Sequence, residues 1–196
     1  VYSVLDYSVE GAKEEISLDD CLTNILSTIE LSAQLESIPF TVFKPTGFGS
    51  FELYEKVSFK EALTEEEAAA WQRVRQRFFL CCDLAQKTGM KLLIDAEESW
   101  IQPAINSIVE EMMSIYNRET AVVHTTAQMY LCEKLDYLYY LSDKAKAEGF
   151  IAGIKLVRGA YMEKERQVAE EKGWSDPICI SKEATDINFN RAWQFI

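Results

Sequence analysis

The chain of 196 residues is acidic, and its totals exclude several functional classes. Hydrophobic residues make up 48% and charged residues 27%, which predicts one soluble globular domain with a sizeable core. With 32 acidic and 20 basic side chains the formal net charge is −12, so the phosphate-binding surface of a nucleic-acid-binding protein is not expected. No apolar run approaches the roughly 20 residues of a membrane span, and the sequence gives no support for secretion.

The elements are predicted from short apolar runs, rich in β-branched and aromatic residues, that alternate with longer segments of helical periodicity. This alternation indicates β-α units around a parallel sheet. The predicted strands span residues 1–6, 39–44, 90–95, 121–126 and 150–157. The predicted helices span residues 18–36, 65–88, 99–117, 130–149 and 161–173, and residues 47–63 are expected to form a loop with a short helix at the mouth of the sheet.

Capping residues define the predicted helix ends. Ser17, with an acid three positions later, is typical of a helix N-cap, and Thr64 precedes an acidic first turn. Gly89 and Gly149 are expected to terminate their helices. The chain starts inside a predicted strand without methionine and stops on the amphipathic run RAWQFI, so we expect a fragment of a longer protein.

Five cysteines and one histidine limit the metal and redox chemistry of the chain. The cysteines are scattered and lack metal-ligand spacing, which indicates free thiols in a reducing compartment; they are Cys21, Cys81, Cys82, Cys132 and Cys179. Because His124 is the only histidine, a multi-histidine metal site is excluded and no metal is expected. His124 itself is expected to be a hydrogen-bonded residue on a strand, so acid–base chemistry would fall to Lys, Asp, Glu or Tyr.

Polar side chains interrupt or end the apolar strands at equivalent places. They are Asp6, Lys44, Asp95, Thr126 and Lys155, with Gln128 just beyond the fourth strand. Because the C-terminal ends of parallel strands meet at one face, we expect these side chains to share a ligand site. A cation such as Lys155 inside an apolar strand is costly unless it is paired, so it requires a carboxylate or a ligand. Structural ion pairs, such as Lys44 with Asp95 or Asp6, remain the alternative for any single position.

Aromatic and small residues outside the strand ends leave further alternatives open. Tyr161 is either a core aromatic at a helix start or a ligand contact, and Gly159 permits either backbone approach to a ligand or a tight strand-to-helix turn. The other conspicuous large side chains lie at helical spacing and indicate packing; they are Met112, Met113, Tyr137, Tyr139 and Tyr140.

Five segments resemble one enzyme family. KLLIDAEESWIQPAI (91–105), TTAQMY (125–130) and above all KLVRGAYMEKER (155–166) resemble proline dehydrogenase, the flavin enzyme that oxidises L-proline to 1-pyrroline-5-carboxylate. VLDYSVEG (4–11) and FTVFKPTGFGS (40–50) resemble the first two strands of that family. The resemblance implies a (β/α)8 barrel of TIM-barrel type with FAD at the C-terminal ends of its strands. Residues 1–196 would hold about its first five β-α units.

The resemblance also implies contacts with the cofactor. Lys155 would lie against the flavin N5 edge, and Gln128 would hydrogen-bond the flavin pyrimidine ring. Thr126 would line the cofactor site, while Val157 and Gly159 would approach the isoalloxazine through their backbone. A cation at N5 stabilises the negative charge that gathers on the reduced ring.

The substrate contacts are implied in the same way. Lys44 matches a lysine near the proline carboxylate, and Tyr161 matches a tyrosine beside the bound proline. Further acidic residues would surround the site, with less definite roles; they are Asp6, Glu10, Asp95 and Glu97. The expected catalytic residues are therefore Lys44, Asp95, Lys155 and Tyr161, and the expected substrate-binding residues are Lys44, Tyr161 and Asp6.

The implied reaction is hydride transfer from the proline ring carbon next to nitrogen to flavin N5, followed by reoxidation of the flavin by a quinone. L-proline and a quinone are thus the implied partners. The implied location is bacterial cytoplasm with peripheral membrane contact, or the mitochondrial matrix.

The sequence departs from the family at two places. Thr125-Thr126-Ala127 stands where the family usually has an Asn-Thr-aromatic run. The last three strands, and the final helix with its arginine pair, have no counterpart before Ile196, so the barrel would not close and the fifth strand would be an edge. Two other interpretations stay open: a catalytically silent partial barrel, and an acidic α/β module that binds an amino acid or small anion without redox chemistry.

Overall fold

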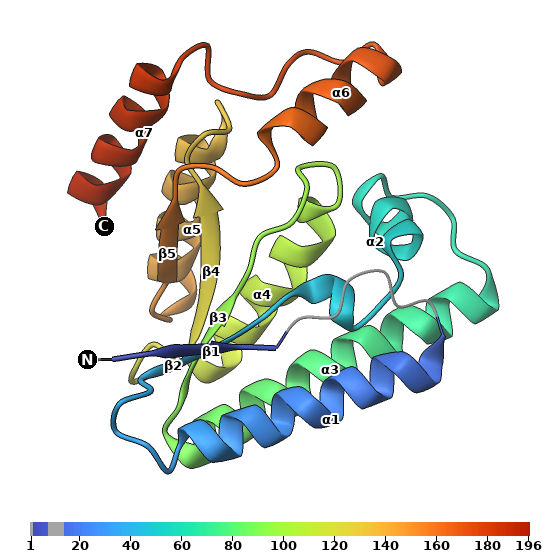
Figure 1. Cartoon of the computed structure of the whole chain (residues 1–196), viewed down its shortest axis with the longest axis vertical. Coiled ribbons are helices and arrows are strands. Elements are labelled where there is room, and N and C mark those ends of the chain that lie inside the picture. Colours follow the sequence, from blue (N-terminus) through green and yellow to red (C-terminus); the bar gives the residue numbers. More distant parts are fainter. Residues whose placement is uncertain (1, 8–13) are drawn as a thin grey trace.

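The computed structural model describes residues 2–7 and 14–196 and shows five strands in one parallel sheet (Figure 1). The strands are β1 Val4–Asp6, β2 Phe40–Phe43, β3 Lys91–Ile94, β4 Val123–Gln128 and β5 Gly153–Val157. The helices are α1 Glu15–Ser32, α2 Phe51–Ser58, α3 Glu65–Thr88, α4 Gln102–Tyr116, α5 Lys134–Glu148, α6 Met162–Lys172 and α7 Lys182–Phe195, with a 3-10 turn η1 at Pro45–Gly47. Among the described residues, no helix combines the length and apolarity needed to cross a membrane.

The order of strands in the sheet follows the order in the chain, from β1 to β5. Each neighbouring pair is parallel and is joined through at least one helix, which is the connectivity of a β/α barrel wall. Strands β1 and β2 run across the view of Figure 1 while β4 and β5 run nearly upright, so the sheet twists strongly between its edges. The predicted α/β fold is confirmed, with β5 at one edge of the sheet.

The predicted helix starts are confirmed at Thr64 and wrong at Ser17. Thr64 forms a full capping box, since its hydroxyl accepts from the Glu67 amide and the Glu67 carboxylate accepts from the Thr64 amide. The first helix instead begins at Glu15 and ends at Ser32, so Ser17 lies in its first turn. The Glu15 carboxylate is paired with guanidinium groups of α3, which favours the earlier start; these are Arg73 at 2.7 Å and Arg77 at 2.5 Å.

Glycine terminates two helices as expected, and α7 is a helix that was not predicted. Gly89 and Gly149 adopt left-handed φ values of 73° and 74° after α3 and α5. The short helix expected within residues 47–63 is α2, capped by Ser50. The amphipathic C-terminal run belongs to α7, which Ser181 caps through a bond from the Ala184 amide.

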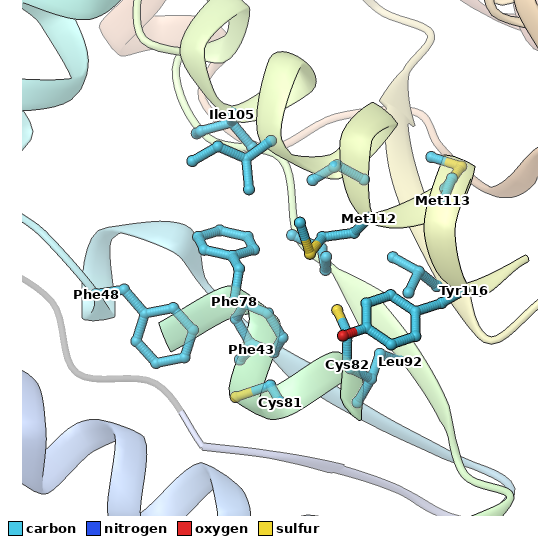
Figure 2. Close-up of a cluster of buried hydrophobic side chains, with 14 of the residues drawn as sticks. Phe43, Phe48, Phe78, Cys81, Cys82, Leu92, Ile105, Met112, Met113 and Tyr116 are labelled. Atoms are coloured by element: carbon cyan, nitrogen blue, oxygen red, sulfur yellow. The ribbon is translucent and has the colours of Figure 1, made fainter. Parts of the chain in front are cut away.

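The main core lies between the sheet and the helices that cover it, as Figure 2 shows. Side chains from β2 and β3, including Phe43 and Leu92, meet α3 and α4 there. The rings of Phe43, Phe48 and Phe78 pack with centroids 5.0–5.4 Å apart. Cys81 and Cys82 are free thiols in this core, and burial raises the pKa of both.

The residues expected to serve packing do so to different degrees. Met112 and Met113 are fully buried. Tyr139 and Tyr140 are exposed, yet the Tyr139 ring packs edge-on against Phe195 with centroids 4.7 Å apart, and Tyr140 donates to the Glu110 carboxylate at 3.1 Å. The predicted packing role is therefore confirmed, although two of these side chains pack at the surface.

The glycine at the start of β5 is required by a close approach to β4. A Cβ atom at Gly153 would lie 2.3 Å from the Val123 carbonyl oxygen and 2.9 Å from the His124 ring. His124 lies opposite Gly153 in the sheet, and its Nδ1 is 3.2 Å from the Leu92 carbonyl oxygen, so the prediction of a hydrogen-bonded strand histidine is confirmed.

We predict that Gly153→Ala lowers the free energy of unfolding by about 1–3 kcal/mol, because the contact is with backbone and the two strands must separate. Urea denaturation measures this change. Gly159→Ala is the control, since its Cβ would meet only the Met162 sulfur at 3.5 Å. Equal effects of the two substitutions would contradict the close approach.

Candidate functional site

The strand register places four polar residues in one row at the C-terminal edge of the sheet. Thr126 pairs directly with Lys155. Ile94 pairs with Thr125 and Phe43 with Ile94, so the next step along each strand aligns Asp95 with Thr126 and Lys44 with Asp95. Because alternate side chains of a strand share a face, all four lie on the sheet face opposite Ile94. The structure thus brings Lys44, Asp95, Thr126 and Lys155 together.

The other predicted acidic residues occupy neighbouring levels or lie outside the described part of the chain. Asp6 pairs with Val42, two residues before Lys44, so it lies on the same face one level below the row. Glu97 lies two residues after Asp95, one level above it. Glu10 lies outside the described residues.

An ion pair between Lys155 and Asp95 spans the fourth strand. The Lys155 ammonium donates to Asp95 Oδ1, and the two side chains keep 28% and 23% of their surface exposed. Between them, Thr126 donates to the Ile94 carbonyl at 2.9 Å and lies 3.5 Å from the same Asp95 oxygen. The charged residue inside β5 therefore has a carboxylate partner within the chain, and a ligand at this position would meet a cation that is already oriented.

The Glu97 carboxylate connects three segments of the chain above this row. Its Oε1 accepts from the Thr46 hydroxyl at 2.8 Å, and its Oε2 accepts from the Tyr161 hydroxyl at 2.9 Å. The side chain of Gln102 holds the Glu97 amide at 2.8 Å. Tyr161 is half-buried, so of its two interpretations the structure supports a hydroxyl that belongs to the strand-end cluster.

The side chain of Gln128 has one unsatisfied polar atom. Its Nε2 donates to the Glu97 carbonyl at 2.8 Å and to the Tyr130 hydroxyl at 2.9 Å. Its Oε1 is buried and has no hydrogen-bond partner among the described residues. A buried acceptor without a donor is costly, so this oxygen suits a ligand that carries an N–H group, which the pyrimidine ring of a flavin does.

The residues after β4 and β5 frame the same edge. The Val157 carbonyl accepts from the Met129 amide at 2.8 Å. Gly159 does not have a positive φ, and a Cβ there would make ordinary contact, so the turn itself does not require glycine. Gly159 lies in the short connection between β5 and α6, so both interpretations, a tight turn and backbone approach to a ligand, stay predictions.

Two residues of this cluster were not predicted from the sequence. Thr46 and Tyr130 lie two residues beyond Lys44 and Gln128, and the two-residue period of strand side chains could have indicated them. Burial raises the pKa of Tyr130 to about 12, so its hydroxyl remains a hydrogen-bonding group at neutral pH. No group of three or more Cys, His, Asp or Glu side chains within residues 2–7 and 14–196 is arranged to hold a metal ion.

Fold and site together define a β/α-barrel-type protein with a cluster of polar side chains at the C-terminal ends of its strands. The model of the proline dehydrogenase family matches residues 1–196, and the chain belongs to this family.

Two curated relatives illustrate the range of the family. The carbapenem antibiotics biosynthesis protein CarD of Pectobacterium carotovorum subsp. carotovorum is 39% identical over 193 residues, which cover 98% of this chain and 50% of that protein. The mitochondrial proline dehydrogenase 1 of Homo sapiens is 37% identical over 133 residues, or 68% of this chain and 22% of that protein. The chain thus spans half or less of the length of each.

Solved structures share the fold. Proline utilization A (PutA) from Bdellovibrio bacteriovorus, inactivated by N-propargylglycine, superposes with a TM-score of 0.82 at 16% identity, over 99% of this chain and 21% of that one. PutA from Corynebacterium freiburgense gives a TM-score of 0.79 at 20% identity, over 100% of this chain and 20% of that one. The expected fold class, a β/α barrel of which this chain holds about five units, is confirmed.

We predict that Glu97 makes the stability of the protein depend on pH. Burial raises the pKa of Glu97 above 4.5, although bonds from Thr46 and Tyr161 oppose the rise. The folded state therefore holds this proton more tightly than the unfolded state, and the associated stability is lost as pH rises from 4.5 through the raised pKa. Glu97→Gln should flatten that loss between pH 4.5 and neutrality, as measured by urea denaturation at several pH values.

The exposed Glu170→Gln on α6 is the matched control and should keep the wild-type slope of stability against pH. Identical slopes in wild type and Glu97→Gln would show that Glu97 titrates as it does in the unfolded chain.

Proposed function

We propose that this chain is part of an FAD-dependent proline dehydrogenase, which oxidises L-proline to 1-pyrroline-5-carboxylate in the first step of proline catabolism. Residues 1–196 would form the first five β-α units of its (β/α)8 catalytic domain. The observation that carries the proposal is the match of the family model along the whole chain, including every residue of the strand-end row. The polar row and the unsatisfied Gln128 oxygen support it independently, because they supply a cation and an acceptor where such a cofactor would lie.

When bound, FAD supplies the two-electron acceptor of the reaction. The residues that would hold it are Lys155, Gln128 and Thr126, together with the backbone of Val157 and Gly159. Lys155 would hold positive charge beside the edge of the cofactor where negative charge develops. Asp95 would keep the ammonium in place, since the two side chains already form an ion pair.

The same row would orient the substrate. The Lys44 ammonium would hold the carboxylate of L-proline, with the Asp6 carboxylate one level below it. Tyr161 would lie beside the pyrrolidine ring, with its hydroxyl fixed by Glu97. These contacts orient the ring carbon next to nitrogen without taking part in bond breaking, which is the usual contribution of a protein to cofactor chemistry.

The electron acceptor and location follow from the same proposal. A quinone would reoxidise the cofactor, and a peripheral contact with a quinone-bearing membrane would bring the two together. Relatives from animals and plants are named mitochondrial, so the mitochondrial matrix and the bacterial cytoplasm are both compatible locations.

The proposal is tested on the full-length protein by flavin absorbance. We expect the purified protein to carry FAD and the flavin band to bleach on anaerobic addition of L-proline. Hydroxyproline is tested in parallel, because a relative from Xenopus laevis, 34% identical over 130 residues, is named hydroxyproline dehydrogenase. A protein without flavin would favour the non-redox amino-acid or anion-binding module, and one whose flavin neither substrate reduces would favour the catalytically silent barrel.

We predict that Lys155→Met in the full-length protein lowers the rate of flavin reduction by L-proline by about 100-fold, because a preorganised charge at the reacting edge is lost. Stopped-flow absorbance measures the rate, and urea denaturation shows that stability changes far less. Lys182→Met is the control, since this lysine is exposed on α7. Equal reduction rates in wild type and Lys155→Met would remove the proposed role of Lys155.

A further inference from the structure

A cavity lined by residues other than those of the strand-end row lies beside the N-terminal end of α5. It is bounded by α5, by α4 and by the segment between α6 and α7, and its volume is about 460 Å³. None of its lining residues belongs to the residues discussed above as cofactor or substrate contacts. The cavity therefore needs its own explanation.

The side chain of Lys134 is buried beside this cavity, and no carboxylate among the described residues lies within hydrogen-bond or ion-pair distance of its ammonium. Only 8% of the residue is exposed, and within the described part of the chain its ammonium makes no hydrogen bond or ion pair. Its neighbour is the Tyr137 ring, whose centroid lies 4.9 Å away. The nearby Glu165 carboxylate accepts instead from the amide and the hydroxyl of Ser99, each at 2.6 Å.

Burial of an ammonium without a hydrogen-bonded acceptor is unfavourable, and the pKa of Lys134 reflects this cost. Burial lowers the pKa of Lys134 to about 8, with partial opposition from the charge of Glu165. A bound carboxylate at this position would replace the missing partner and restore the charged form. The cavity is thus lined by a buried cation that lacks a hydrogen-bonded acceptor.

The other polar lining groups indicate the rest of the ligand. Asn106 uses its Oδ1 to accept from Gln102 at 2.9 Å, and within the described residues its amide nitrogen donates to no other group. Glu133 is exposed at the rim, and its carboxylate makes no hydrogen bond or ion pair in that same part of the chain. Asp176 is already engaged by Arg166 at 3.2 Å. One unpaired cation inside and one unpaired anion at the rim match a zwitterion better than a bare anion.

We propose that this cavity binds a small α-amino acid with an apolar side chain. Its carboxylate contacts the Lys134 ammonium and the Asn106 amide, its ammonium contacts the Glu133 carboxylate, and its side chain packs on the Tyr137 ring and Leu131. This site does not depend on the proposed proline oxidation, because it shares no residue with the strand-end row.

The test is isothermal titration calorimetry of the full-length protein with L-leucine and with two analogues that each lack one charge. These are 4-methylpentanoate, which lacks the ammonium, and 3-methylbutylamine, which lacks the carboxylate. We expect L-leucine to bind, 4-methylpentanoate to bind more weakly and 3-methylbutylamine not to bind. Binding of 4-methylpentanoate as tight as that of L-leucine would overturn the zwitterion assignment.

Two variants locate the binding. Lys134→Met should lower the affinity for L-leucine about tenfold or more, because a charge-assisted contact is lost. Asn106→Asp keeps the acceptor for Gln102 but places a negative charge against the carboxylate, so it should also weaken binding. Lys146→Met, exposed on the same helix, should bind as the wild type does. No binding to the wild type, or equal affinity in wild type and Lys134→Met, would overturn the proposal.

A proton measurement distinguishes this site from any other. Above pH 8 the wild type should take up protons as L-leucine binds, because the carboxylate restores the charge on Lys134, and Lys134→Met should not. The other titratable groups that line this cavity are Cys132, Glu133, Tyr137 and Asp176, and Glu165 lies beside it; burial raises the pKa of the Cys132 thiol, and Cys132→Ser should keep the proton uptake. Burial raises the pKa of Tyr137 well above 10, so it stays neutral in this range, and Glu165→Gln should keep the proton uptake. Equal uptake in wild type and Lys134→Met would overturn the role of Lys134.

Discussion

The ion pair between Lys155 and Asp95 is the interaction on which the candidate site depends. It joins the end of β3 to β5 across Thr126 of β4, so it can form only when all three strands are in the observed register. A slip of one residue would turn one of these side chains to the opposite, helix-covered face of the sheet. The two side chains keep 28% and 23% of their surface exposed, so water would still solvate the charge that remains after one partner is removed, and the loss of stability would be modest. The main role of the pair is therefore to hold an oriented cation at the edge of the sheet.

A second layer of bonds makes that edge rigid. The Glu97 carboxylate accepts hydrogen bonds from the hydroxyl groups of Thr46, after β2, and Tyr161, after β5. The Glu97 carbonyl accepts a hydrogen bond from Gln128 of β4. Three β-α units therefore meet at one residue, and the orientation of Tyr161 is set by a carboxylate rather than by chance packing. Positioning of this kind is what the proposed flavin enzyme would require from its protein part, since the cofactor would perform the redox step. Gln128 retains an unsatisfied oxygen within the same layer, which is the clearest indication that a further group belongs there.

Much of this arrangement could be predicted from the sequence, because it depends on local patterns. The strands and most helices follow from apolar periodicity and from caps such as Thr64, and Lys155 attracts attention as a cation within an apolar run. The start of α1 could not be predicted, because Arg73 and Arg77 of α3 stabilise it from more than fifty residues away. Ion pairs between strands could not be predicted for the same reason, because no local sequence pattern shows that Lys155 pairs with Asp95. The cavity around Lys134 depends on contacts between α4, α5 and the α6–α7 segment, which sequence periodicity does not report.

The most direct test of the central claim is the midpoint potential of the flavin bound to the full-length protein. If the Lys155 ammonium stabilises negative charge on the reduced cofactor, Lys155→Met should lower the potential relative to the wild type. Asp95→Asn, which removes the opposing carboxylate and leaves the cation, should raise it or leave it unchanged. A potential in Lys155→Met equal to that of the wild type would contradict the account, because the charge of residue 155 would then have no contact with the redox centre.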